Sequence, residues 1–405
     1  MTREAGEGIG RRKVEGAGGG VDGRAEGLRR SSPKPGRESG LALARSAMKR
    51  YVLSNSSWHY EHGLLIGAIR EAGDAWGDAG LSRGARDLAS ALVSADGAIR
   101  GYRPEEFNLD MINSGRNLLS LFSETGETRL RLALDALASQ LSSQPRTISG
   151  GFWHKLIYPN QIWLDGLYMA QPFAVRYGLM FGNPSFVEDA VAQFLLAAKK
   201  TRDPRTGLFR HAWDEERAQP WADPETGRAP NAWGRAMGWF AMALVDVIEV
   251  LYPGSAGRGE LCALLSGIAD ALAEFQDPAT GLWYQVLDQG EREGNYLEAS
   301  VSSMLPYAFL KGVRLGALDA VRFVPIACRA YEGACGRFLS RDPDGCVHLE
   351  GVCSVAGLGG TPYRDGSFEY YVREPIKADD YKGVGPFILA SIEYEAALTS
   401  RGAAA

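Results

Sequence analysis

The chain has few of the residues that hold metal ions or build disulfide frameworks. It contains 405 residues but only five cysteines and five histidines. An odd number of cysteines in a long chain does not indicate a disulfide framework, and neither the cysteines nor the scattered histidines have the spacing of a zinc site. We therefore expect buried free thiols and no metal site. The cysteines are Cys262, Cys328, Cys335, Cys346 and Cys353.

An excess of charge of one sign and a long hydrophobic run are also missing. The 44 Lys and Arg residues against 49 Asp and Glu residues leave a net charge of -5, which argues against nucleic acid as a partner. No run of about 18 apolar residues occurs, so we expect no membrane span. The N-terminus lacks the apolar core of a signal peptide, which favours a cytoplasmic protein.

Residues 1–40 differ in composition from the rest of the chain. They are rich in Gly, Arg, Glu and Ser and contain almost no large apolar side chain. Such a segment cannot bury enough surface to offset the entropy lost on ordering, so we expect a disordered N-terminal tail. Its two basic clusters leave open an interaction role, although a plain solvated tail is the simpler interpretation.

From residue 41 to residue 400 the pattern is helical. About a dozen segments carry apolar residues at helical spacing, and strand-like alternation is scarce. Asp-Pro turns that end in Gly recur at Asp203, Asp223, Asp277 and Asp342. The recurrence of helix, turn and short aromatic segment predicts stacked helical hairpins. We expect an all-α catalytic domain, a closed toroid of six hairpins with its functional site at the centre of the ring.

The segment 150–178 is the most informative stretch. It surrounds one carboxylate, Asp165, with four aromatic residues and places His154 and Lys155 just upstream. An acid among aromatic rings is desolvated, so its pKa can rise until it is protonated at neutral pH. Aromatic rings also offer flat apolar platforms for sugar faces. The pattern indicates proton chemistry on a carbohydrate, against the alternative of a core helix that contains an aspartate. The aromatic residues are Trp153, Trp163, Tyr168 and Phe173.

Three other segments combine polar and aromatic residues. The first is WHYEHG at 58–63, the second contains Asp110 just before a helix, and the third, 211–239, contains four tryptophans with His211 and Arg235. Four tryptophans are more than the packing of a loop ordinarily requires. Plainer alternatives are a helix cap for Asp110, a loop histidine for His211, and a salt bridge of Arg235 with Asp214 or Glu216.

These segments resemble the unsaturated rhamnogalacturonyl hydrolases of glycoside hydrolase family 105. The resemblance covers residues 41–400 and is most specific in FWHKLIYPNQIWLDGLYMAQPF, HAWDEERAQPWADPETG, NAWGRAMGW and GTPYRDGSFEYYVREPIKADDYKGVGPF. It implies an (α/α)6 barrel, an unsaturated oligosaccharide as substrate and no cofactor. It also implies removal of the 4,5-unsaturated galacturonyl residue from lyase-generated rhamnogalacturonan, by hydration of the C4=C5 enol ether.

The same resemblance implies roles for individual residues. Asp165 matches the general acid and base of the family, and Asp110 is expected to bind substrate hydroxyls or place the water. Arg235 is expected to bind the uronate carboxylate through its two-pronged guanidinium. The remaining substrate-binding residues implied are His211, the stacking residues Trp233 and Trp239, and the secondary contacts Tyr60, His154 and Lys155.

Three other functions remain open at this point. One is an unsaturated glucuronyl hydrolase that acts on another polysaccharide fragment. A second is a sugar 2-epimerase on the same toroid, with His154 and His211 as its proton-transfer pair. The third is a carbohydrate-binding protein without turnover. We expect a monomer or a weak homo-oligomer.

Overall fold

The computed structural model describes residues 33–51 and 57–404, with side chains up to residue 400. The chain divides into two units, 1–31 and 32–405, and the fold belongs to the second. Residues 1–32 of the predicted N-terminal tail lie outside the described part, so disorder there stays a prediction. The predicted boundary at residue 40 is too late, because helix α1 begins at Arg37 and buries Ser39 and Gly40. Within the described part, no helix is long and apolar enough to cross a membrane.

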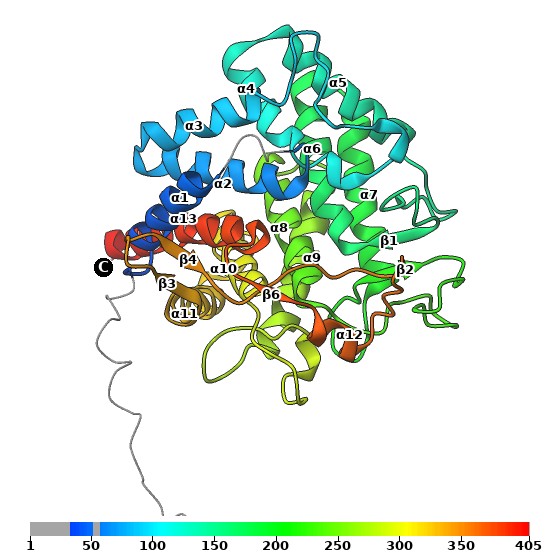
Figure 1. Cartoon of the computed structure of the whole chain (residues 1–405). Helices are drawn as coiled ribbons and strands as arrows, with labels where there is room; N and C mark the ends of the chain where they lie inside the picture. The colour runs from blue at the N-terminus through cyan, green and yellow to red at the C-terminus, as the bar shows by residue number, and fades with distance from the viewer. Residues whose placement is uncertain (1–32, 52–56, 405) are drawn as a thin grey trace, which may run out of the picture. The chain divides into compact units, whose positions relative to one another are not determined.

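Within the described ranges, six inner helices form a closed ring in which each helix packs against the next and the last packs against the first (Figure 1). In chain order they are α2 (Tyr60–Trp76), α4 (Gly115–Thr125), α6 (Leu164–Phe181), α8 (Gly234–Val250), α10 (Ala299–Arg314) and α13 (Tyr381–Ala404).

Six outer helices pack on the ring, and each lies beside an inner helix that is its neighbour along the chain or across the closure. They are α1 (Arg37–Arg50), α3 (Ala79–Ser90), α5 (Thr128–Ser143), α7 (Pro184–Thr201), α9 (Arg258–Glu274) and α11 (Ala320–Phe338). This arrangement confirms the predicted all-α (α/α)6 barrel.

Inner and outer helices differ in sequence because they differ in burial. The inner helix α8 is buried on all sides from Gly234 to Ile248, and apart from Arg235 and Asp246 this stretch carries no charged side chain. The outer helix α3 buries only one face, through Leu81, Ser82, Ala85 and Ala89. An all-round apolar helix requires neighbours on every side, which is the position of an inner helix.

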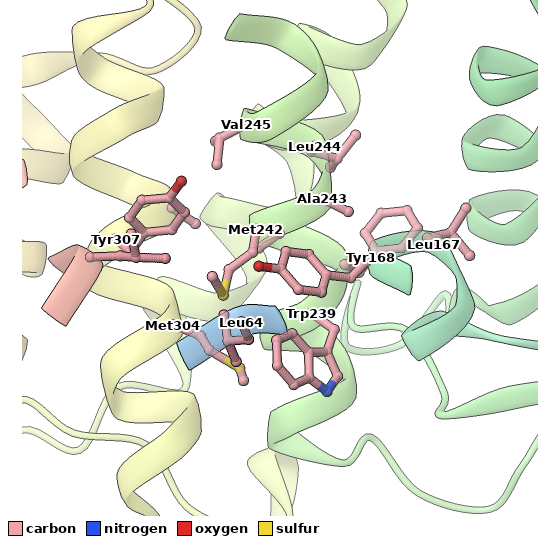
Figure 2. Packing of buried hydrophobic residues seen from close by; sticks show 14 of the residues in the cluster. Leu64, Leu167, Tyr168, Trp239, Met242, Ala243, Leu244, Val245, Met304 and Tyr307 are labelled. Carbon is pink, nitrogen blue, oxygen red and sulfur yellow. The ribbon is translucent and has the colours of Figure 1, made fainter. Parts of the chain in front are cut away.

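Side chains fill the ring between its two ends (Figure 2). Tyr168 from α6 stacks on Trp239 from α8 with 4.6 Å between ring centroids. Leu64 from α2 and Met304 from α10 belong to the same buried cluster. Since inner helices from several hairpins meet in this layer, the barrel is a packed core rather than a pore.

Short elements connect the helices. Three two-stranded antiparallel sheets pair β1 (Gln161–Trp163) with β2 (Ala212–Asp214), β3 (Leu339–Arg341) with β4 (Val347–Leu349), and β5 (Val352–Cys353) with β6 (Ile376–Lys377) within the described residues. The other short elements are η2 (Pro104–Glu106), η3 (Leu109–Met111), η4 (Leu287–Gln289) and α12 (Phe368–Arg373).

The predicted Asp-Pro turns are present. In the first of them the backbone N–H of Asp203 donates to the carbonyl of Leu208 at 2.8 Å, and Gly207 has φ of 74°. The turns that start at Asp223 and Asp277 repeat this pattern. Glycine is favoured at the fifth position of these three turns because side chains disfavour positive φ.

Candidate active site

The predicted site residues gather at the N-terminal ends of the inner helices. Tyr60 is the first residue of α2, Asp165 the second of α6 and Arg235 the second of α8. Asp110 lies in η3, which directly precedes α4. The site therefore lies at one end of the ring, on segments that lead into the inner helices.

The two-stranded ribbon β1–β2 brings Asp165 and His211 together. Its register pairs Trp163 with Ala212, and the next backbone hydrogen bond joins Leu164 N–H to the His211 carbonyl at 3.0 Å. Asp165 is the second residue after β1, and His211 directly precedes β2. Residues 46 positions apart are thus placed side by side by a strand pair that runs straight into the helix.

Asp165 and His211 share a hydrogen bond of 3.0 Å between Oδ2 and Nε2. The second imidazole nitrogen, Nδ1, lies 2.7 Å from the hydroxyl of Tyr371 on α12. His211 is fully buried, whereas the Asp165 side chain keeps 14% of its surface accessible. A carboxylate at the edge of a buried network remains reachable by a ligand.

Asp110 lies in a second polar cluster. Lys155 Nζ approaches its carboxylate to 2.6 Å and His154 Nε2 to 3.5 Å. Burial alone would raise the pKa of Asp110, but the charges of Lys155 and the nearby histidines outweigh it and hold that pKa at about 2. Burial lowers the pKa of His154 to about 4, so its imidazole is neutral at pH 7. Asp110 is therefore an anion, suited to accepting hydrogen bonds.

The helix-cap alternative for Asp110 is wrong. Ser114 occupies the N-cap position of α4, and the Asn108 side chain accepts a hydrogen bond from the Asp110 backbone N–H. The carboxylate of Asp110 faces Lys155 and His154 instead.

Three nearly parallel rings connect the Asp110 cluster to the Asp165 cluster. His154 stacks on Trp163 with centroids 4.9 Å apart, and Tyr158 stacks on Trp163 at 4.7 Å. The edge of Trp163 in turn meets the His211 ring at 5.3 Å. Trp163 thus separates the Asp110 cluster from the Asp165 cluster while touching residues of both.

The four tryptophans of segment 211–239 correct one expectation. All are buried, with exposed fractions of 5% for Trp213, 4% for Trp221, 2% for Trp233 and 1% for Trp239. Packing accounts for them after all, because Trp221 joins Trp163 and other residues in a separate apolar cluster beneath the loops. The loops over the barrel end therefore form a small apolar core that is separate from the core of the barrel.

Trp233 and Trp239 make their ring contacts within the protein. Trp233 stacks on Tyr371 at 5.9 Å and donates its indole N–H to Gln285 Oε1 at 3.1 Å. Trp239 stacks on Tyr168 and meets Tyr60 edge-on at 6.0 Å. Their expected stacking on sugar faces stays a prediction.

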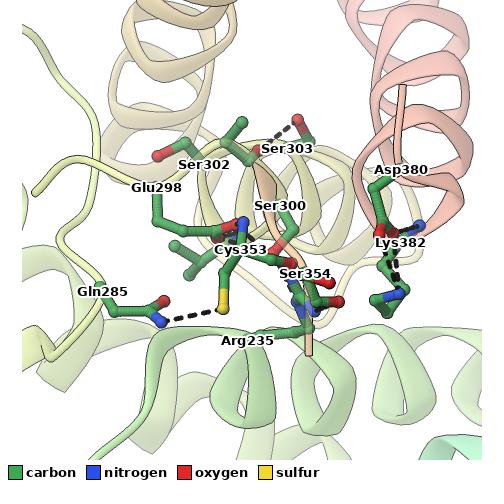
Figure 3. A network of polar contacts seen from close by, with 12 residues as sticks. Arg235, Gln285, Glu298, Ser300, Ser302, Ser303, Cys353, Ser354, Asp380 and Lys382 are labelled. Carbon is green, nitrogen blue, oxygen red and sulfur yellow. Dashed lines mark hydrogen bonds and ion pairs between the residues drawn. The ribbon is translucent and has the colours of Figure 1, made fainter. Parts of the chain in front are cut away.

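Arg235 lies in a network of polar contacts at the N-terminal ends of α8 and α10 (Figure 3). Its guanidinium is 1% exposed and donates to Ser300 Oγ at 2.8 Å, to Glu298 Oε1 at 3.3 Å and to the Cys353 carbonyl. The alternative partners Asp214 and Glu216 are therefore wrong. The expected contact with a uronate carboxylate stays a prediction, and it requires some of these contacts to be exchanged.

A further ion-pair group lies beside Tyr60. Lys382, 4% exposed, approaches Glu61 Oε1 to 2.6 Å and Asp380 Oδ1 to 2.8 Å. Sequence reasoning named neither Lys382 nor Tyr371 as a site residue, although both lie in the segment 360–387 that carries the family resemblance. Glu298, the partner of Arg235, lies outside the four segments that carry the family resemblance.

Within the described residues, no group of three or more His, Cys, Asp or Glu side chains is placed to hold a metal ion. The site instead combines one partly accessible carboxylate, one ionised carboxylate beside a lysine, and several aromatic rings. This combination suits proton transfer to a polar, ring-shaped substrate.

Comparison with known proteins gives the family. A sequence profile described as Glycosyl Hydrolase Family 88 matches residues 42–398. The chain belongs to this family. A solved structure from C. acetobutylicum ATCC 824, a glycoside hydrolase from family 105, has 45% sequence identity and a TM-score of 0.85, over 88% of this chain and 99% of that chain. The resemblance to family 105 is thereby confirmed.

Two curated relatives match about half of the chain. Protein Atu3128 of Agrobacterium fabrum is 41% identical over 230 residues, which are 56% of this chain and 97% of that protein. The unsaturated rhamnogalacturonyl hydrolase YesR of Bacillus subtilis is 30% identical over 218 residues, 51% of this chain and 59% of that protein. The chain is thus a glycoside hydrolase of the family 88 and 105 type with an oligosaccharide substrate. This result removes the epimerase and the non-catalytic alternatives.

Proposed function

We propose that this glycoside hydrolase removes the 4,5-unsaturated galacturonyl residue from lyase-generated rhamnogalacturonan oligosaccharides. The observation that carries the proposal is the partly accessible Asp165 carboxylate, held by His211 at the centre of the helical ring. The name and activity of the Bacillus subtilis relative support the choice of rhamnogalacturonan.

The reaction is the addition of water across the C4=C5 double bond. Protonated Asp165 gives its proton to C4 while water forms a bond to C5 and returns a proton to the carboxylate. The hemiketal formed at C5 then opens to a ketone, and its rearrangement expels the remaining sugar. No bond to the glycosidic carbon is attacked, so the two-carboxylate geometry of ordinary glycosidases is not needed. Positioned proton transfer of this kind contributes a factor of about 10² to 10⁴.

Asp110 is proposed to bind sugar hydroxyls or to orient the attacking water. Its anionic state supports this role, because a carboxylate offers acceptors on both oxygens. Lys155 and His154 hold the carboxylate in place and are proposed as secondary contacts with the substrate.

The remaining contacts are proposed from the family resemblance. Arg235 binds the uronate carboxylate after giving up part of its contact with protein acceptors. Tyr60, Trp233 and Trp239 form the apolar wall against which the sugar packs. His211 acts on the substrate through Asp165, because Tyr371 and Asp165 already engage both of its ring nitrogens. A cytoplasmic location and a monomeric or weakly associated state also remain part of the proposal.

The test is a spectroscopic assay with the unsaturated galacturonyl-rhamnose disaccharide. Hydration removes the conjugated double bond, so ultraviolet absorbance falls with turnover. We expect Asp165→Asn to abolish this loss and Asp87→Asn, a change on the exposed face of the outer helix α3, to leave it intact.

A panel of unsaturated glucuronyl disaccharides decides the substrate. Faster turnover of a glucuronyl substrate than of the galacturonyl-rhamnose disaccharide would replace the rhamnogalacturonan assignment by the glucuronyl alternative. Turnover that survives Asp165→Asn in folded protein would remove Asp165 from its role.

A further inference from the structure

A chain of two hydrogen bonds ends at the carboxylate of Asp165. The hydroxyl of Tyr371 lies 2.7 Å from His211 Nδ1, and His211 Nε2 lies 3.0 Å from Asp165 Oδ2. The three residues come from α12, from the residue before β2 and from the first turn of α6. Tyr371 is 160 residues from His211 in sequence, so only the folded chain brings them together.

The imidazole at the centre of this chain is held from several sides. His211 and Tyr371 are both fully buried. The Trp233 ring lies 4.8 Å from the imidazole, and the edge of Trp163 lies 5.3 Å from it. The backbone N–H of His211 also donates to the Asn231 carbonyl at 3.1 Å. A ring flip would break both side-chain hydrogen bonds in a space that rigid rings already fill.

The Tyr371 hydroxyl is available as a hydrogen-bond donor in this chain. Burial, together with nearby Tyr370 and the Asp165 carboxylate, raises the pKa of Tyr371 well above its ordinary value, so the phenol stays neutral. Its other charged or ionisable neighbours are Arg364 and the buried thiol of Cys353. Within the described residues, His211 Nδ1 is the hydrogen-bond partner of this hydroxyl.

The direction of both hydrogen bonds follows from the states of the end groups. A neutral imidazole carries one proton, on Nδ1 or on Nε2. An ionised carboxylate only accepts, so a proton on Nε2 gives a good bond to Asp165 and leaves Nδ1 as the acceptor for the Tyr371 hydroxyl. A proton on Nδ1 would instead set the Nε2 lone pair against Oδ2 of Asp165.

We propose that Tyr371 is a positioning residue that fixes His211 in the tautomer protonated at Nε2, so that Asp165 exchanges its catalytic proton through Oδ1 alone. Oδ2 is then a permanent acceptor, whereas Oδ1 has no hydrogen-bond partner among the described residues. In a protease triad a buried carboxylate sets the tautomer of a histidine by the same logic.

The proton step balances without any further group, and it rests on the proposed function. The O–H bond at Oδ1 breaks as the C4–H bond forms. Water then bonds to C5 through its oxygen, and one of its protons returns to Oδ1. His211 and Tyr371 keep their protons throughout, so they direct the transfer and take no part in the bond changes.

The first experiment measures the tautomer directly, in wild-type protein labelled with ¹⁵N in its histidine rings. Signals of His211 are identified by their absence in His211→Gln. We expect an unprotonated Nδ1 and a protonated Nε2, a result that needs no substrate and, apart from the signal assignment, no variant. A proton on Nδ1 in the wild-type protein would overturn the proposal.

The second experiment compares two neighbouring tyrosines. Tyr371→Phe removes the hydroxyl in the chain, whereas Tyr370→Phe removes one that accepts a hydrogen bond from the Gly357 N–H instead. We expect Tyr371→Phe to give a mixed His211 tautomer and a kcat lower by about 10- to 10²-fold, within the range of positioned proton transfer, with KM nearly unchanged. Tyr370→Phe should keep the wild-type tautomer.

The pH profile adds a signature that a merely structural role would not produce. Loss of the Nε2–H donor destabilises the ionised form of Asp165, so the basic limb of kcat should move to higher pH in Tyr371→Phe. An unchanged profile and tautomer in this variant would contradict the proposal. Failure of every unsaturated substrate with the expected tautomer intact would instead count against the proposed function and leave the tautomer assignment standing.

Discussion

Two aspartates of the inner ring show that a carboxylate has very different contacts at the two ends of the ring. Asp165 lies in the first turn of α6, where Oδ2 meets one imidazole nitrogen, that of His211, and Oδ1 has no hydrogen-bond partner among the described residues. Asp246 lies near the end of α8 and is fully buried. Lys311 and Tyr307 approach its Oδ1 to 2.8 Å and 2.6 Å, and Arg116 approaches its Oδ2 to 2.6 Å.

This difference in contacts distinguishes a carboxylate that stabilises the fold, Asp246, from one that can take part in proton transfer, Asp165. Burial alone would raise the pKa of Asp246, but Lys311 and Arg116 outweigh it and lower that pKa, so the carboxylate is a fixed anion that ties α4, α8 and α10 together. A carboxylate with every oxygen occupied has no room to exchange a proton with a ligand. Asp165, with an open oxygen and partial exposure, has that room.

The largest expected effects come from replacing each of the two aspartates by asparagine in separate variants. Asp246→Asn should lower the free energy of unfolding by about 3 to 5 kcal/mol, because it removes the anion that Arg116 contacts and one of the two anions around the buried Lys311. Asp165→Asn should lower kcat/KM by a factor of about 10² to 10⁴ and change the free energy of unfolding by less than about 1 kcal/mol. Urea denaturation and the ultraviolet assay measure the two quantities.

The exposed change Asp87→Asn is the control for both measurements, and it should alter neither. The comparison between the two ends fails if folded Asp246→Asn loses as much activity as Asp165→Asn. It also fails if Asp165→Asn is the less stable of the pair.

A medium effect is expected from the ion pair between Lys155 and Asp110. With its folded pKa held at about 2, Asp110 contributes stability that is present above the ordinary carboxyl pKa near 4 and is lost as pH falls toward 2. Lys155→Met removes the first compensating charge, so the pKa of Asp110 should rise. We expect about 2 kcal/mol less stability at pH 7 and a flatter loss of stability between pH 4 and pH 2.

The control for this variant is Lys199→Met at the end of the outer helix α7, which should retain the wild-type acid profile. Urea denaturation at several pH values gives both curves. An acid profile of Lys155→Met that coincides with that of the wild-type protein would show that Lys155 does not hold Asp110 ionised.

Much of this site could be predicted from sequence because its parts are local. Helical spacing predicted the six-hairpin ring, and the segment 150–178 identified Asp165 through its aromatic neighbours. His211 and Arg235 came from a second aromatic segment. Each of these signals lies within about 30 consecutive residues, a scale on which periodicity and composition carry information.

The partners of these residues could not be predicted, because they are set by tertiary contact. The carboxylates that were the alternative partners of Arg235, Asp214 and Glu216, do not contact it, and its actual partner Glu298 lies 63 residues away in sequence. Tyr371 reaches His211 only because α12 folds back over the ring. Burial of the tryptophans depends in the same way on loops that meet across the barrel end.

The smallest expected effect concerns the rim of the site end, just before α13. His348 Nδ1 lies 2.6 Å from Asp379 Oδ2, and its Nε2 lies 3.3 Å from Asp342 Oδ2. The hydrogen bond with Asp379 is the main cause of a raised pKa for His348, with a smaller contribution from Asp342. Protonated His348 therefore stabilises the folded state below the ordinary histidine pKa of about 6.5, and this contribution is lost as pH rises through the raised pKa.

We expect His348→Gln to cost less than about 1 kcal/mol of stability at pH 6, because the side chain is 25% exposed, and to cost progressively less toward pH 9. Asp342→Asn removes only the longer contact and should keep most of the pH dependence. Denaturation curves at pH 6 and pH 9 test this expectation. Equal pH dependence in His348→Gln and in the wild-type protein would mean that protonation of His348 does not contribute to the stability of the fold.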